Sequence, residues 1–163
     1  MSLYEICVLI HDTSIGTAIR ESRLIFPMIE GTHLLAMGAS AGIIAFSDLR
    51  LLGWVMKKEP VSEVMGRLLP WAIGGFVVVM ITGILLFWSD AESLYRNRWF
   101  RYKVLFLFLA GLNALIYHST IHRKVWAWDR EPIPPRSARL AGLFSLALWA
   151  LVIAAGRTTA YKM

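Results

Sequence analysis

Long apolar stretches dominate the hydropathy pattern of this chain and set its predicted architecture. Four of them are long enough to cross a bilayer, which takes about 20 predominantly apolar residues. They cover residues 24–46, 64–88, 100–121 and 138–156. The connections between them are about 10–20 residues long, as in an up-down bundle. The pattern therefore predicts an all-α integral membrane protein whose transmembrane domain, residues 24–163, is a four-helix up-down bundle.

Residues 1–23 have a different pattern. Apolar side chains recur there at helical spacing, as at Leu3, Ile6 and Ile10, and charged side chains interrupt the run. A signal peptide has a basic segment before an uninterrupted apolar core, and residues 1–23 do not have this pattern. We expect an amphipathic helix that lies in the membrane interface, before the chain turns into its first span at Pro27.

Composition agrees with a membrane protein. Hydrophobic residues make up 57% of the 163 residues and charged residues 17%, against about 45–50% and about 25% in soluble domains. The single cysteine, Cys7, excludes an internal disulfide and a cysteine metal cluster. The net charge of +6 comes from basic residues in short loops between apolar runs, which favours anionic lipid over nucleic acid as the partner.

The orientation in the membrane follows only weakly from charge. An even number of spans places both termini on the same side. Lysine and arginine are divided almost evenly between the two sets of connections, so the positive-inside rule gives little preference. We expect the termini outside the cell, in the periplasm if the organism is a bacterium.

Polar residues of the first span fall on one stripe of the helix. At about 100° per residue, this stripe contains Glu30, His33, Met37, Ser40 and Asp48. Ionisable groups inside a bilayer are expensive and mark functional sites by default. We therefore expect the stripe to face the bundle interior. A purely structural alternative is that Glu30 and His33 bond to each other and to a neighbouring helix.

The chemical interpretation is a ligand site. Neutral imidazole binds haem iron or copper, which makes His33 a candidate ligand. Met37, one turn along, either supplies a soft ligand or packs. Lys103 of the third span either extends to the headgroups or holds a carboxylate, such as a haem propionate or Glu30. Near the end of that span, His118 and His122 are one turn apart and form either a metal site or a wet interfacial pair.

Depth separates the two histidines of the spans. Counted from the same membrane side at 1.5 Å per residue, His33 and His118 differ in depth by roughly 13 Å. One iron bridged by this pair is therefore disfavoured, and His118 is expected to serve a second site or the inner end of an electron path. His11 is the other histidine that can approach His33. Small residues, among them Gly74, Gly75 and Gly83, make room for helix packing or for a planar cofactor.

Several segments resemble a bacterial family of small four-helix membrane proteins of unknown function. They are Pro27–His33 (PMIEGTH), Asp48–Gly53 (DLRLLG), Thr82–Phe87 (TGILLF), Trp99–Lys103 (WFRYK) and the pair Gly156-Arg157. The resemblance extends over nearly the whole chain and is most specific at Asp48–Gly53. It implies a multi-pass protein of the bacterial inner membrane.

More distantly, the layout is similar to membrane protoporphyrinogen oxidases of the HemJ type and to CopD-type copper-resistance membrane proteins. The first of these resemblances maps a histidine and a lysine linked to haem b binding onto His33 and Lys103. The surroundings of His33 differ from that family, and Asp48–Gly53 replaces a different loop. The resemblance therefore implies haem binding rather than the oxidase reaction.

These observations lead to one functional hypothesis and two alternatives. The hypothesis is a haem-b-binding membrane subunit of an oxidoreductase that passes electrons between a partner protein and the quinone pool. His33 is its axial ligand, with Glu30 beside it, and Lys103 and Arg157 hold propionates or an anionic substrate. One alternative is a copper-handling protein that uses His33, Met37 and His11. The other is a non-catalytic anchor or assembly subunit, bound to a partner or to a second copy of the chain.

Overall fold

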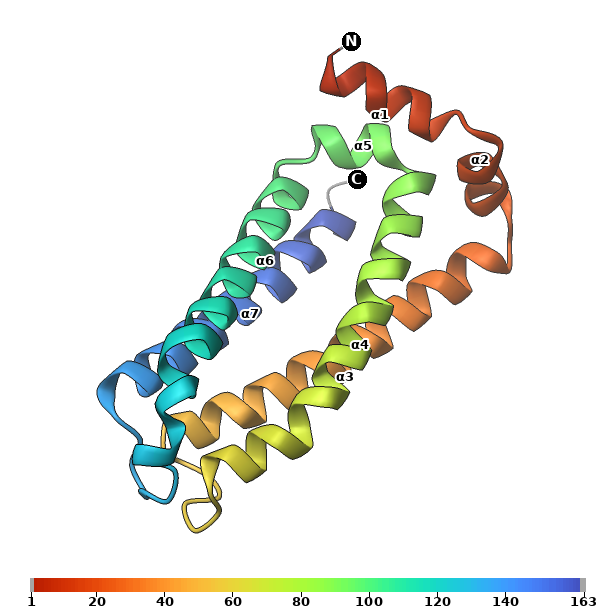
Figure 1. Ribbon diagram of the computed structural model, residues 1–163. Coiled ribbons are helices and arrows are strands. Elements are labelled where there is room, and N and C mark those ends of the chain that lie inside the picture. The colour runs from red at the N-terminus through yellow and green to blue at the C-terminus, as the bar shows by residue number, and fades with distance from the viewer. Residues whose placement is uncertain (1, 162–163) are drawn as a thin grey trace.

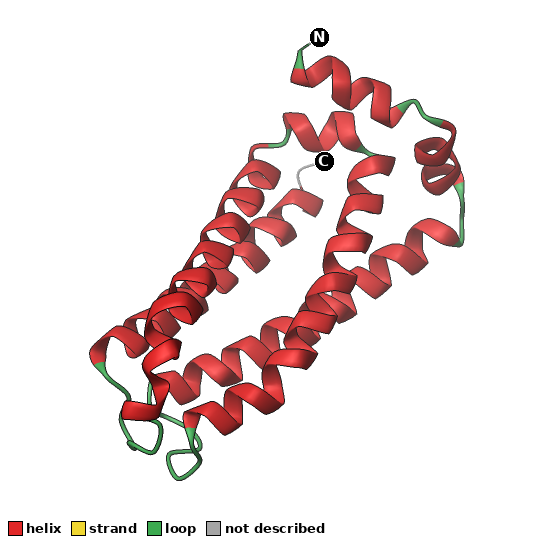
Figure 2. Ribbon diagram, viewed as in Figure 1, coloured by secondary structure: helices red, strands yellow, loops and turns green. Residues whose placement is uncertain are grey.

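The computed structural model describes residues 2–161, which are almost wholly helical and include no strand (Figure 2). The long helices are α3 (Ile25–Leu51), α4 (Val61–Ser89), α6 (Arg98–Ile116) and α7 (Arg136–Tyr161). A π-helical turn, η1 (Tyr117–Ile121), and a 3-10 helix, η2 (His122–Ala127), extend α6. Together they form four segments long and apolar enough to cross a membrane, which confirms the predicted all-α four-helix bundle.

The observed helices are longer than the predicted spans at nearly every end. Hydropathy marks only the apolar middle of a helix, whereas backbone hydrogen bonding continues into polar turns at its ends. The helix α3, for example, includes the polar turn around Asp48 and Arg50. Pro27 lies in the first turn of α3, as predicted.

The helices are arranged as two pairs (Figure 1). The first pair is α3 with α4, the second is α6 with α7, and α3 and α7 join the pairs. Both chain ends lie at one end of the bundle, which we call the terminal end. The connections α3–α4 and η2–α7 lie at the opposite end, the loop end.

Three short helices lie across the terminal end: α1 (Leu3–His11), α2 (Ser14–Glu21) and α5 (Ala91–Arg96). The sequence predicts one amphipathic helix where the structure has α1 and α2. The helices separate because the hydroxyl of Thr13 accepts a hydrogen bond from the backbone N–H of Gly16 and so starts a new helix.

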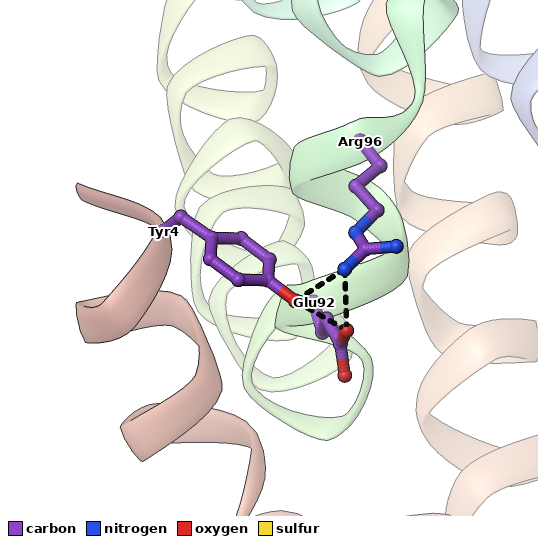
Figure 3. Close-up of polar contacts among 3 residues, drawn as sticks. All are labelled: Tyr4, Glu92 and Arg96. Atoms are coloured by element: carbon purple, nitrogen blue, oxygen red, sulfur yellow. Dashed lines mark hydrogen bonds and ion pairs between the residues drawn. The ribbon is translucent and has the colours of Figure 1, made fainter. Parts of the chain in front are cut away.

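A small polar cluster attaches α1 to α5 (Figure 3). The hydroxyl of Tyr4 donates to Oε1 of Glu92 at 2.7 Å and accepts a hydrogen bond from Arg96. The Arg96 guanidinium also pairs with Glu92 at 3.2 Å and lies 4.9 Å from the centre of the Tyr4 ring. The first helix is therefore held in place by both charge and ring contacts.

At the loop end the chain forms a small core and two tied loops. The core includes Leu51, Met65 and Trp128. The fully buried Arg50 donates from Nε and Nη2 to the carbonyl oxygen of Glu59 at 3.2 and 2.8 Å. It also reaches the carbonyl oxygen of Glu131 at 3.4 Å, so one side chain ties both connections of this end.

Large apolar side chains cover the outside of the long helices. Leu35, Trp71 and Phe108 are 78%, 74% and 67% exposed. Acyl chains solvate such a surface and water does not, so the exposed apolar belt fits the lipid-facing wall of a multi-pass membrane protein.

Candidate functional site

A cavity of about 530 Å³ lies between the two helix pairs in the terminal half of the bundle. We call it the terminal-end cavity. Its volume falls within the range of about 300–1,000 Å³ that is usual for small-molecule and cofactor sites. Among its lining residues are Arg20, Glu30, His33, Met37, Asp90, Lys103 and Arg157. Four of the five predicted site residues thus share one cavity, and the fifth, His118, does not line it.

His33 is the most constrained polar group of this cavity. Its side chain is 6% exposed, and its Nδ1 lies 2.9 Å from Oγ1 of Thr82 on α4. The Thr82 hydroxyl donates its one proton to a carbonyl of its own helix, that of Val78 at 2.6 Å. Nδ1 must therefore be the donor in its bond with Thr82, which leaves Nε2 as an unprotonated acceptor.

The Nε2 atom of His33 is available to a ligand. The ring is hydrogen-bonded from α4, where the Thr82 hydroxyl contacts Nδ1 and the Val79 backbone is a second partner, and among the described residues no hydrogen bond is assigned to Nε2. A metal-binding histidine typically donates its other ring N–H to an oxygen, which fixes the tautomer, and the bond to Thr82 has that form. The bond between Glu30 and His33 that the purely structural alternative requires does not form, because the imidazole is turned towards α4.

A glycine makes this position of the imidazole possible. A Cβ atom added to Gly83 would lie 3.2 Å from Cε1 of His33, closer than an ordinary contact. Gly75, two turns earlier on α4, likewise leaves room for a side chain of α3: a Cβ there would lie 2.2 Å from Oγ of Ser40. These two glycines allow the close approach of α3 that the sequence predicts, whereas nothing lies near the Cβ position of Gly74.

The cavity carries positive charge from three elements. Lys103 of α6 packs its stem against Gly156, and within residues 2–161 its ammonium has no hydrogen bond or ion pair. Arg157 of α7 is bonded to the hydroxyl of Tyr161 at 2.7 Å. Arg20 of α2 donates to the carbonyl of Ser89 at 2.9 Å. The Lys103–Glu30 pair, one of the alternatives that the sequence leaves open, is not formed.

Acidic groups offset this charge only in part. Glu30, like Arg157, is an exposed residue of the cavity lining. Burial raises the pKa of Asp90, and the nearby His11, the Ser93 hydroxyl and Arg20 counteract only part of this shift. A carboxyl with a raised pKa is less readily ionised, so the cavity favours an anionic ligand group over a cationic one.

His118 lines a second cavity, of about 230 Å³, in the loop half of the bundle. We call it the loop-end cavity. His118 and His33 therefore occupy separate places, as their predicted depths require. The His118 ring lies 5.1 Å from the Tyr117 ring and 5.2 Å from the His122 ring, between centres. Asp48 and Ser145 line the same cavity.

Two further residues of the candidate sites are missing from the sequence prediction. Arg20 reaches the terminal-end cavity because α2 folds back against the end of α4, where the indole N–H of Trp88 donates to Thr13 at 2.7 Å, and Asp90 reaches it as the residue that ends α4. The spacing of residues within one helix does not predict such contacts between helices. His11 is not in the cavity lining, and its Nδ1 lies 3.2 Å from Arg20.

Comparison with known proteins identifies a family and no function. No curated protein and no solved structure matches the chain. The more distant resemblances to HemJ-type and CopD-type proteins therefore gain no support from the comparisons. One family model matches, that of a family of unknown function, DUF6644, and it covers residues 22–162. The chain belongs to this family.

Proposed function

We propose that the terminal-end cavity holds a haem b, and that the chain is a membrane subunit that passes electrons between a partner protein and the quinone pool. The observation that carries the proposal is the geometry of His33. Its Nδ1 is fixed as a donor to Thr82, and its Nε2 is an unprotonated acceptor without a partner in the described chain. That is the form of imidazole that binds iron.

The number of available ligands favours haem over a bare ion. The porphyrin already supplies four nitrogen ligands, so one axial histidine is enough to hold the iron. A bare ion needs several protein ligands, and the described residues contain no group of three His, Cys, Asp or Glu side chains that could hold one.

The charges of the cavity suit the rest of the cofactor. Haem carries two propionates, and the cavity offers Lys103, Arg157 and Arg20 from three different elements. The proposal agrees with the HemJ-type resemblance at His33 and Lys103, and it does not include the oxidase reaction of those proteins.

A copper-handling function is the second candidate, and one observation favours it. Met37 lines the same cavity as His33, one helical turn away, so a nitrogen and a sulfur ligand lie on one side of α3. The third ligand suggested by the sequence, His11, is turned towards Arg20 instead. For this reason we rank copper below haem.

The test is an absorption spectrum of the detergent-purified protein, oxidised and dithionite-reduced, after expression with an adequate haem supply. We expect a b-type spectrum in the wild-type protein. His33→Ala should lower haem occupancy at least tenfold, whereas His122→Ala should retain it.

Other results would replace the proposal. Stoichiometric copper without a Soret band would establish the copper function. A protein with neither haem nor copper that co-purifies with a partner would point to the anchor function. Equal haem content in the two variants would remove His33 as the axial ligand.

A further inference from the structure

We propose that the loop-end cavity binds the ring of a quinone or hydroquinone, with the carboxyl of Asp48 as its hydrogen-bonding group. The inference rests on the proposed function, for which it identifies the place where the quinone pool meets the chain. It concerns binding only and depends on a different cavity from the proposed haem.

The carboxyl of Asp48 is buried in the wall of the loop-end cavity. The side chain is 6% exposed and lines the cavity. Its Oδ2 has no hydrogen-bond partner among the described residues. An unpaired polar atom in an apolar interior is unfavourable, so a ligand that bonds to it gains affinity. Ser145 of α7 and Tyr117 are polar neighbours of this carboxyl.

A carboxyl is suited to both redox forms of a quinone. Protonated Asp48 can donate to a quinone carbonyl, and ionised Asp48 can accept from a hydroquinone hydroxyl. His118 offers the same choice elsewhere in the cavity lining, because imidazole has one donor and one acceptor nitrogen. It stands on the π-helical turn η1, a type of irregularity that is frequent at functional sites.

The size and the lining of the cavity fit a substituted ring. An engineered apolar cavity of about 150 Å³ accepts benzene, and this one has about 230 Å³. Phe76 and Trp149 line it in an edge-to-face pair, with ring centres 6.3 Å apart. The remaining wall is mainly aliphatic, which suits an uncharged ring.

The loop-end cavity is accessible from the lipid. The cavity is lined from both α4 and α6, which belong to different helix pairs. On α4, Ile73 is 53% exposed, and on α6 both Gly111 and Ala114 are exposed. A ligand with a long isoprenoid tail can therefore enter between α4 and α6 and leave its tail among the acyl chains.

The experiment measures equilibrium binding of oxidised ubiquinone-1 to the purified full chain in lipid nanodiscs by calorimetry. Asp48→Leu keeps the volume and removes the carboxyl, and it should raise the Kd at least tenfold. Asp48→Asn should lose less affinity, because an amide N–H can still donate to the quinone carbonyl. Glu63→Gln, on the exposed surface of α4, is the matched control and should bind as the wild-type protein does.

A second variant covers the case in which Asp48→Leu fails to fold. Ala114→Phe places a ring at the lipid-facing mouth and should weaken binding similarly. Unchanged binding in a folded Asp48→Leu protein, or no binding by the wild-type protein, would overturn the inference. Haem content is recorded on the same samples: a colourless protein that binds ubiquinone-1 through Asp48 would overturn the proposed function and leave this inference in place.

Discussion

At the scale of single residues, a threonine decides what the buried histidine can do. The Thr82 hydroxyl has one proton and donates it to the carbonyl of Val78. Oγ1 of Thr82 can therefore only accept a hydrogen bond from His33. The position of the proton on the imidazole is therefore set from α4, one helix away from the histidine itself.

Replacement of this hydroxyl tests the tautomer argument. Thr82→Val keeps the shape of the side chain and removes the acceptor, so the imidazole loses the group that fixes its ring. Under the proposed function, haem affinity should fall by about 10–100-fold, the range found for partners of metal ligands. Thr82→Ser keeps the hydroxyl and should stay near the wild-type value. A haem titration of the three proteins checks this, and equal affinity for the valine and serine variants would contradict it.

At the scale of elements, the end of α3 connects the bundle to both loops of the loop end. Asp48 faces a cavity, while Arg50 binds the carbonyls of Glu59 and Glu131. Gly53 follows at φ 73°, where a Cβ would lie 3.1 Å from the carbonyl oxygen of Pro132. The segment that carries the most specific family resemblance thus combines a helix end, two loop contacts and a left-handed turn.

Arg50 should be the most sensitive of these positions for stability. Arg50→Met keeps an apolar stem but leaves the carbonyls of Glu59 and Glu131 without this donor. A hydrogen bond to a charged group contributes about 1.5–3 kcal/mol. Thermal unfolding in detergent should show a drop in Tm of several degrees. The Tm of Arg50→Lys should lie between those of the wild-type protein and Arg50→Met, because an ammonium lacks the planar fork of donors.

Arg67→Met is the control for that experiment. Arg67 forms an exposed pair with Glu63 on α4, and exposed pairs contribute little to stability. A similar loss of Tm for both methionine variants would indicate a general effect of removing positive charge and not the loss of the loop contacts.

At the scale of the whole molecule, the two helix pairs are held together at the loop end, and the short helices α1, α2 and α5 lie across the terminal end. Asp90 stands where α4 meets α5, and it lines the terminal-end cavity. Its buried carboxyl connects the stability of the fold to pH.

The sign of this dependence follows from the raised pKa of Asp90. A carboxyl with a raised pKa in the folded state stabilises the fold below its unfolded pKa of about 3.9, and this contribution is lost as the pH rises through the folded value. Asp90→Asn removes the ionised form, so it should raise the Tm at pH 7, and the gain should shrink towards pH 4. A gain independent of pH would contradict the assignment to this ionisation.

Much of the architecture could be predicted from the sequence, and the reasons differ between features. The spans follow from hydropathy because the bilayer demands long apolar runs. The burial of His33, Ser40 and Asp48 follows from their helical period, and the structure confirms it. Within one helix, chemical pattern and geometry are tied together by a fixed rotation per residue.

Contacts between elements could not be predicted, because the fixed rotation per residue relates only positions within one helix. The bond from His33 to Thr82, the approach of Arg20 to the cavity and the tie from Arg50 to both loops all join positions far apart in the sequence. The π-helical turn at Tyr117 leaves no mark in the hydropathy pattern. The separation of His33 and His118 was predictable, because depth along a helix needs only residue counting.

The two cavities lie at different depths, and this has an electrical consequence. His33 and Asp48 are 15 residues apart on α3, which corresponds to about 22 Å along the helix axis and, with an ordinary tilt, about two thirds of the hydrocarbon thickness. Moving one elementary charge across the full membrane involves about 2.3 kcal/mol per 100 mV. A charge that travels between the two cavities therefore does work of about 1.5 kcal/mol per 100 mV, with or against the membrane voltage according to its direction.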